Sequence, residues 1–332
     1  MSLPGASGGA RPDWSGRLVW IVLAATVAAM AVVIVMALVD ARAPRRDGAQ
    51  IEVRLSAPQQ PDAAVPDPGL VEQTPDGPLP IIGRDGRQPW QAYARSFDAA
   101  DKRPRVALVV AGLGLDADAT RAAIAQLPAA VTLGFSPYTR DLPYGIAAAR
   151  KAGHEVLIGL PMEPAEYPRK DPGPETLLTT LDPKKNLDRL HWVMGRGAAY
   201  VGLVGIMGDR FTQQRDSLEP VLDEMKARGL LYVDDHDGSK SLAGTVAHEL
   251  GMEWAVTDRI LDDDPTAPAI EKALAELEAA ATRDGAALGL GGLYPVTLDR
   301  VLAWTATLDA KGIALAPATA IATRQKLPAP AP

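Results

Sequence analysis

The densest group of side chains that could do chemistry is Asp234, Asp235, His236 and Asp237, directly after the apolar segment LLYV. Carboxylate oxygens and an imidazole nitrogen are ligands for a divalent metal ion. Aspartate followed by Gly238 is equally typical of a turn that leads into a helix. Because strand residues alternate between two faces, a regular strand cannot point Asp234 and Asp235 to the same side. We therefore take these two aspartates as catalytic candidates and keep the turn as the alternative.

A second motif, RVALVVAGLGLDA at 105–117, matches a dinucleotide-binding fingerprint through Gly112, Gly114 and Ala117. That function requires a carboxylate at the end of the next strand to bind the ribose hydroxyls. The next apolar segment ends instead in Ser-Pro-Tyr at 136–138. A nicotinamide-dependent oxidoreductase is therefore kept only as an alternative, and it requires a doubly wound sheet.

Composition narrows the class of protein and of partner. The 332 residues are 47% hydrophobic and 23% charged, as in ordinary globular proteins. The net charge of −7 provides no basic field for nucleic acid, so we expect no nucleic-acid partner. No cysteine is present, which excludes disulfides and thiolate metal sites. An imidazole-rich metal site could draw only on His154, His191, His236 and His248.

The beginning of the chain contains a long apolar run. Residues 18–39 carry no charge and are long enough to cross a hydrocarbon core of about 30 Å. A cleaved signal peptide is the alternative, but its apolar core is usually about 7–15 residues long. We expect 1–17 to be an N-terminal tail and 18–39 a transmembrane anchor. Two arginines precede the span and three follow it, so the charge count does not favour an amino terminus on the inside and leans weakly the other way.

Two further segments separate the apolar run from the main domain. Residues 40–77 are polar and rich in proline, which predicts a disordered linker. Within 78–102, Trp90, Tyr93 and Phe97 fall on one face of a short helix. A flexible linker gains nothing from three aromatic residues, so we expect 78–102 to dock on the folded domain.

From 103 to 322, amphipathic helices alternate with apolar strands. Glycines such as Gly251 and Gly285 stand where a helix must end before the next strand begins. About eight strands alternating with helices predict an α/β fold with parallel strands and outer helices. The fold is then a parallel β/α barrel of seven or eight strands, or a doubly wound sheet. In both, ligands bind at the carboxyl ends of the strands. Residues 323–332 are expected to be a C-terminal tail.

The segments that end at these positions resemble, in order, the divergent polysaccharide deacetylase family. They are RVALVVAGLGL, GHEVLIGLPMEP, YPRKDPGPETLL, NLDRLHW, YVGLVGIMGDRF and RGLLYVDD. The resemblance covers about 78–98 and nearly all of 103–322. It implies a barrel of the glycoside hydrolase/deacetylase type behind an N-terminal membrane anchor. It also implies an inner-membrane location with the barrel on the periplasmic side, although the arginines that flank the span lean weakly toward the opposite orientation.

The family is similar to metal-dependent carbohydrate esterases, in which an Asp and two His hold a divalent metal such as zinc. The metal-bound water attacks an N-acetyl group. This chain departs from that pattern at four positions. Ala111 and Gly112 replace a pair of aspartates, and Gly159 and Ile206 replace histidines. None of these side chains can coordinate a metal, so we expect neither a metal nor another cofactor.

The remaining polar residues near the strand ends suggest binding rather than metal chemistry. Glu163, Asp209, Arg210 and His236 are the expected substrate-binding residues. The resemblance implies a role in the metabolism of a cell-envelope glycan, with deacetylation reduced or absent. The alternative is a non-catalytic scaffold that binds an envelope glycan or an envelope protein.

Overall fold

The computed structural model describes residues 65–235 and 240–325, which belong to one compact unit of the chain. The expected anchor at 18–39 and the candidate His236 lie outside the described residues. No helix within the described ranges is both long and apolar enough to span a bilayer.

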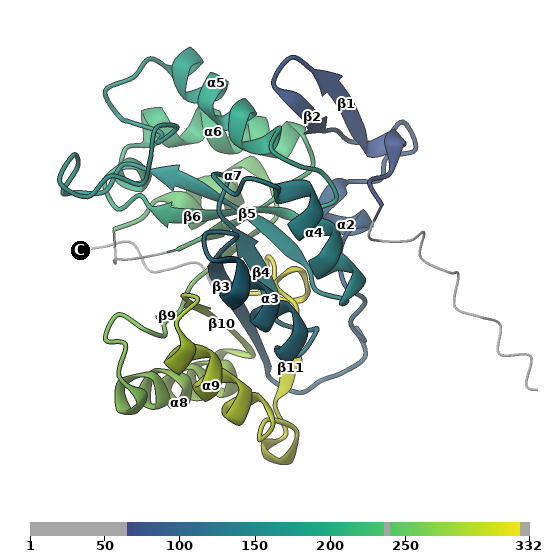
Figure 1. The fold of residues 1–332 in the computed structure, drawn as a ribbon, viewed down its shortest axis with the longest axis vertical. Coiled ribbons are helices and arrows are strands. Elements are labelled where there is room, and N and C mark those ends of the chain that lie inside the picture. The colour runs from purple at the N-terminus through teal and green to yellow at the C-terminus, as the bar shows by residue number, and fades with distance from the viewer. Residues whose placement is uncertain (1–64, 236–239, 326–332) are drawn as a thin grey trace, which may run out of the picture. The chain divides into compact units, whose positions relative to one another are not determined.

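A parallel sheet of nine strands forms the centre of this unit (Figure 1). Its hydrogen-bonded neighbours follow the order β8-β7-β6-β5-β4-β3-β10-β9, and β11 adds to the beginning of β3. The strands are β3 (Arg105–Leu113), β4 (Thr132–Phe135), β5 (Val156–Met162), β6 (Gly202–Met207), β7 (Leu231–Asp234), β8 (Trp254–Val256), β9 (Arg259–Ile260), β10 (Ala286–Gly291) and β11 (Ala314–Ala316). The predicted parallel α/β architecture is thus confirmed.

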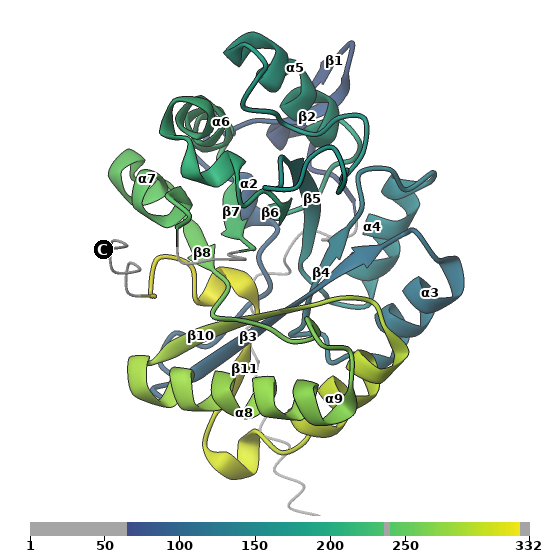
Figure 2. The same cartoon turned by 90° about the vertical axis from the view of Figure 1, so that its left-hand side faces the viewer.

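Helices surround the outside of this sheet (Figure 2). They are α3 (Ala117–Gln126), α4 (Leu142–Lys151), α5 (Pro183–Met194), α6 (Arg215–Ala227), α7 (Ala243–Leu250), α8 (Ala267–Asp284) and α9 (Pro295–Thr305). Short 3-10 turns lie at Pro68–Leu70 (η1), Phe211–Gln213 (η2), Asp309–Lys311 (η3) and Ala318–Ala320 (η4). The helices end as predicted, since Gly251 and Gly285 close α7 and α8 in the left-handed conformation.

The sheet is curled, because its two end strands are neighbours in the chain. β8 and β9 lie at opposite ends of the pairing order, yet only Thr257 and Asp258 separate them. Three residue steps span at most about 11 Å, so the ends of the sheet must come together. A flat doubly wound sheet cannot meet this condition, so the oxidoreductase alternative loses the fold that it requires. The expected barrel needs one correction, since among the described strands β8 and β9 are not hydrogen-bonded to each other.

Side chains bridge this interruption. The Gln325 amide donates to the Val256 carbonyl (2.7 Å) and accepts from the Val256 N–H (2.8 Å). The same amide donates to the Asp258 carboxylate (2.7 Å), which also accepts from the Leu288 N–H of β10 (2.8 Å). The expected tail at 323–332 therefore begins inside the fold: Thr323 donates its N–H to the Trp254 carbonyl at 2.8 Å.

The folded part also begins earlier than the expected linker boundary at residue 77. An antiparallel hairpin, β1 (Val71–Thr74) and β2 (Gly77–Pro80), is held by the buried side chains of Leu70 and Leu79.

In the docking segment, α2 covers only Pro89–Ala92, so Phe97 lies beyond the predicted helix. Tyr93 is nevertheless buried, and its hydroxyl accepts from the Asp67 N–H at 2.9 Å.

Candidate functional site

The carboxyl ends of β3 to β10 form the edge at which this fold binds ligands, here called the mouth. At the end of β3, the pairing with β4 shifts register between Ala111 and Leu113, and Gly112 has φ of +88°. Nothing lies within 4 Å of the point where a Cβ of residue 112 would stand. Where the family resemblance implies an aspartate, the structure therefore has open space and no donor atom.

The second replaced position is filled rather than open. Gly159 pairs with Val204 and Pro161 pairs with Ile206, so Gly159 and Ile206 face the same side of the sheet. A Cβ at residue 159 would lie only 2.9 Å from Cγ1 of Ile206. Ile206 thus occupies the space in which a histidine at 159 would need to lie.

Glu163 follows β5 directly, and its carboxylate is fully engaged by neighbouring groups. Its Oε2 accepts from the N–H (2.6 Å) and the hydroxyl (2.7 Å) of Thr179. Its Oε1 accepts from Nη1 of Arg210 at 3.2 Å. The side chain is buried, and its backbone carbonyl also accepts from the N–H groups of Arg210 and Phe211. Glu163 therefore joins the loops that follow β5 and β6, and its oxygens do not face a ligand.

Asp209 and Arg210 complete this connection between the two loops. Asp209 accepts from the Ala165 N–H (2.8 Å), and Nη2 of Arg210 donates to the Ala165 carbonyl (2.7 Å). The structure thus brings Glu163, Asp209 and Arg210 together, as the sequence predicted. Of the three, Arg210 has the most accessible side chain, with 46% of its surface exposed. It is the member of this group best able to contact a bound molecule.

The two catalytic candidates lie at the end of β7, and both are buried. Asp234 accepts a hydrogen bond from the Ser241 hydroxyl at 2.7 Å, and its backbone carbonyl accepts from both the N–H and the hydroxyl of Thr257. Oδ1 of Asp235 lies 3.1 Å from the point where a Cβ of Gly205 would stand. Both carboxylates are therefore built into the strand end beside β6 and β8.

Tyr232, which sequence reasoning did not single out, lies beside these aspartates. It is completely buried, and its hydroxyl is 3.9 Å from the sulfur of Met162. Burial raises the pKa of the Tyr232 hydroxyl well above its ordinary value, and the charges of Asp234 and Asp235 raise it further. The phenol therefore stays protonated, and its O–H can donate a hydrogen bond only to neighbouring groups in the core. No sequence signal marked it, because a tyrosine in a buried strand usually serves packing.

The residues at these positions do not supply the Asp and His ligands that the family resemblance implies. Ala111, Gly112, Gly159 and Ile206 offer no donor atoms, and no group of three or more His, Asp or Glu side chains in the described ranges could hold a metal ion.

Large apolar side chains are exposed directly after three of the strands. They are Leu115 after β3, Met207 at the end of β6 and Tyr294 after β10. Met207 also has φ of +61°, a conformation that residues with a side chain adopt rarely, and Ala199 and Thr323 share it. Exposed apolar groups beside polar ones are typical of binding surfaces. These residues were not among the candidates predicted from the sequence, although each is adjacent to a glycine or proline that follows its strand.

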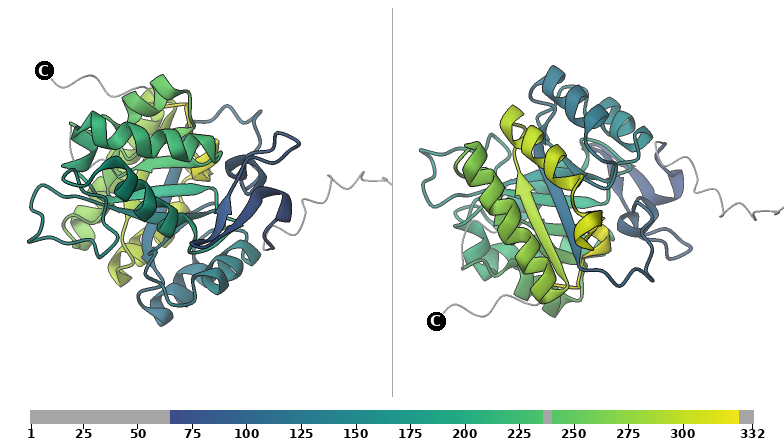
Figure 3. Two further views of the ribbon diagram at one scale, coloured as in Figure 1. Left: turned by 90° about the horizontal axis from the view of Figure 1, so that it is seen from above. Right: turned by 90° about the horizontal axis from the view of Figure 1, so that it is seen from below.

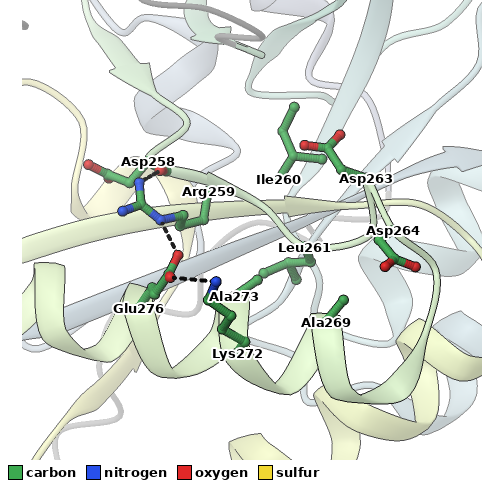
Figure 4. A pocket seen from close by; sticks show the side chains of 10 residues that line it. All are labelled: Asp258, Arg259, Ile260, Leu261, Asp263, Asp264, Ala269, Lys272, Ala273 and Glu276. Carbon is green, nitrogen blue, oxygen red and sulfur yellow. Dashed lines mark hydrogen bonds and ion pairs between the residues drawn. The ribbon is translucent and has the colours of Figure 1, made fainter.

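A separate pocket of about 490 Å³ lies between β9 and α8, beside the interruption in the sheet (Figure 4). Three of its charged side chains form ion pairs: Glu276 pairs with Arg259 at 2.9 Å and with Lys272 at 3.9 Å. Burial raises the pKa of Asp258 at its end. Glu276 is thus already held by two cations, whereas Asp263 and Asp264 also line the pocket.

Comparisons with known proteins agree with this architecture. A crystal structure of the uncharacterized protein ATU2773 from Agrobacterium tumefaciens is 37% identical, with a TM-score of 0.72 over 74% of this chain and 99% of that one. An uncharacterized protein of Haemophilus influenzae is 23% identical over 62% of this chain and 72% of its own length. The uncharacterized protein YibQ of Escherichia coli is 27% identical over 54% of this chain and 55% of its own.

The family assignment rests on the main domain as a whole. The model of the divergent polysaccharide deacetylase family matches residues 108–322, which is well over half of the chain and includes every strand of the sheet except the first residues of β3. The chain therefore belongs to the divergent polysaccharide deacetylase family.

Proposed function

We propose that this protein binds a cell-envelope glycan at the mouth without deacetylating it through a metal-bound water. The observation that carries the proposal is the position of Ile206, whose side chain occupies the space that a Cβ at residue 159 would need. Ala111 and Gly112 leave the neighbouring position without a donor atom. A metal-activated water has no protein ligands to hold its metal at these positions.

The mouth retains features that suit a saccharide. Sugars present apolar ring faces and hydroxyl groups, and binding sites combine apolar or aromatic side chains with a few polar ones. Tyr294 and Leu115 supply exposed apolar surface after the adjacent strands β10 and β3. Arg210 supplies hydrogen-bond donors after β6. In this proposal Asp234, Asp235 and Glu163 shape the mouth from beneath and do not act as catalysts.

The proposal includes the location of the protein. The uncharged run at 18–39 supports a single-pass anchor in the inner membrane, and family membership supports a periplasmic barrel. In this arrangement a polar, proline-rich segment precedes the folded domain, which suits a protein that reaches envelope glycan from the membrane.

A binding measurement tests this function. Purified full-length chain in a non-ionic detergent is titrated with N-acetylglucosamine oligomers by isothermal calorimetry. The double variant Leu115→Ala/Tyr294→Ala should lose most of the binding, and Ile82→Ala, an exposed apolar residue of the N-terminal segment, should retain it. Binding that is absent from the wild type, or unchanged in the double variant, contradicts the proposal.

A second candidate is an envelope protein as partner, favoured by the same exposed apolar side chains. Met207 supports it because methionine adapts to irregular protein surfaces. Failure of every glycan to bind, together with loss of a co-purifying envelope protein in Leu115→Ala/Tyr294→Ala, would select this alternative.

A further inference from the structure

The amino-terminal ends of β3 and β10, opposite the mouth, carry a pocket of about 350 Å³. Figure 3 shows these two strands side by side from below. The pocket is lined by four cationic side chains, Lys102, Arg103, Arg105 and Arg324, and by two carboxylates. This excess of positive charge is notable in a chain whose net charge is −7.

Arg105 is the unusual member of this set because it is 95% buried, with a relative exposure of 5%. Two of its N–H groups donate to the carbonyls of Ala320 (2.9 Å) and Asp101 (3.2 Å), and its guanidinium stacks over Phe97 at 4.6 Å. No carboxylate of a described residue forms an ion pair with it. Buried charges in proteins are normally paired with an opposite charge or with a ligand.

The nearby carboxylates are engaged by other arginines. Asp101 pairs with Arg103 at 2.7 Å, and this interaction lowers the pKa of Asp101 to about 2. Asp284 pairs with Arg283 at 2.6 Å. Arg103 makes a second ion pair with Asp309 at 2.6 Å. The carboxylates of Asp101 and Asp284 are thus held by other arginines, and neither forms an ion pair with Arg105.

Arg105 lies near a second cation, Arg324, as well as near the carboxylates of Asp101 and Asp98. Arg324 lies close enough for its charge to lower the pKa of the Arg105 guanidinium, in addition to the larger effect of burial. The two guanidinium charges repel each other across the pocket, and an anion bound between them would relieve that repulsion. Arginine is well suited to this role, since its planar fork binds the oxygens of phosphate in pairs.

We propose that this pocket binds a phosphate group, held by Arg105 and Arg324 with Lys102 at its rim. Phosphate fits because it is a compact anion with up to two negative charges and several acceptor oxygens. The group is either free inorganic phosphate or the phosphate of a lipid headgroup. The site lies at the opposite end of the strands from the mouth and does not depend on the function proposed there.

Calorimetric titration of the full-length chain with inorganic phosphate, in a polyoxyethylene detergent at low ionic strength, tests the site. The wild type should bind one phosphate per chain, and added salt should weaken the binding. Arg324→Gln should weaken it at least about tenfold, because a charge-assisted hydrogen bond is lost. Lys102→Gln should weaken it less, and Arg84→Gln, an exposed arginine outside the pocket, should leave it unchanged.

The competing outcomes are distinct. Saturable binding that Arg324→Gln and Lys102→Gln both leave unchanged overturns the proposal, as does an absence of saturable binding to wild type. Arg324 is exposed, so its variant should show the thermal unfolding of the wild type. Soluble short-chain phosphatidylglycerol, added as a competitor, identifies the source: displacement of phosphate indicates a lipid headgroup, and no displacement indicates the free ion.

Discussion

The position of Ile206 beside Gly159 leads to a quantitative prediction about the stability of the mouth. The substitution Gly159→Ala places a Cβ 2.9 Å from Cγ1 of Ile206 and 3.4 Å from its Cδ1. Real Cβ atoms do not approach another carbon at 2.9 Å, so Ile206 or its strand must shift. Overpacking of this kind costs about 1–3 kcal/mol of unfolding free energy.

A double-mutant cycle isolates this contact. Ile206→Ala removes both atoms that the new methyl group would meet, so Gly159→Ala should cost at least about 1 kcal/mol less in that background than in the wild type. Urea unfolding of the full-length chain in non-ionic detergent, followed by tryptophan fluorescence, gives the four free energies. Ile206→Ala alone should also destabilise, because it removes apolar contacts at a half-buried site.

The refuting result is additivity. If the two changes add to within about 0.5 kcal/mol, the side chains are not in contact and Ile206 does not fill the ligand position. Apolar volume would then not occupy the place of a metal ligand at residue 159.

Three further substitutions probe the groups that hold the mouth and the curled sheet. Glu163→Gln should lower the unfolding free energy by about 2–4 kcal/mol. Arg210 then loses the buried carboxylate that accepts its hydrogen bond, and the new NH2 group faces an N–H or O–H donor. Gln325→Ala should cost about 1–3 kcal/mol, since it removes three hydrogen bonds that bridge the sheet ends, whereas Gln126→Ala, an exposed residue without such bonds, should cost far less. Burial raises the pKa of Asp258, so the stability that its carboxyl contributes is present below its unfolded pKa and is lost as the pH rises through the folded value. The stability of the wild type relative to Asp258→Asn should therefore fall from about pH 4 upward, and a difference that rises over this range contradicts the assignment.

Much of the fold was predictable because its signals are local. The buried faces of α6 and α8 follow from the spacing of apolar residues, and the glycines that end the helices follow from the conformation they must adopt. β9 has only two residues, which are too few to show an alternation of apolar and polar side chains. The bridge from Gln325 to Val256 joins residues 69 positions apart, and nothing in the local sequence marks it. The hairpin at 71–80 was hidden by prolines that suggested a linker.

The candidate site was predictable to a similar degree. The rule that ligands bind at the carboxyl ends of parallel strands placed Glu163 and Arg210 at the same edge, and the structure joins them at 3.2 Å. The sequence could not show that Thr179, 16 residues away, satisfies the same carboxylate. It therefore proposed as a substrate ligand a group whose hydrogen bonds are already used within the protein. Residue type locates a polar group, and only its neighbours show whether it is free to bind.

Metal content and acetate release, measured together on the purified full-length chain, test the central claim most directly. The protein is loaded with zinc, freed of excess metal and incubated with N-acetylglucosamine oligomers. If the mouth lacks a catalytic metal site, the protein should retain far less than one zinc per chain and release no acetate above a protein-free control. One tightly bound zinc per chain, with acetate release that a chelator abolishes and zinc restores, would contradict it.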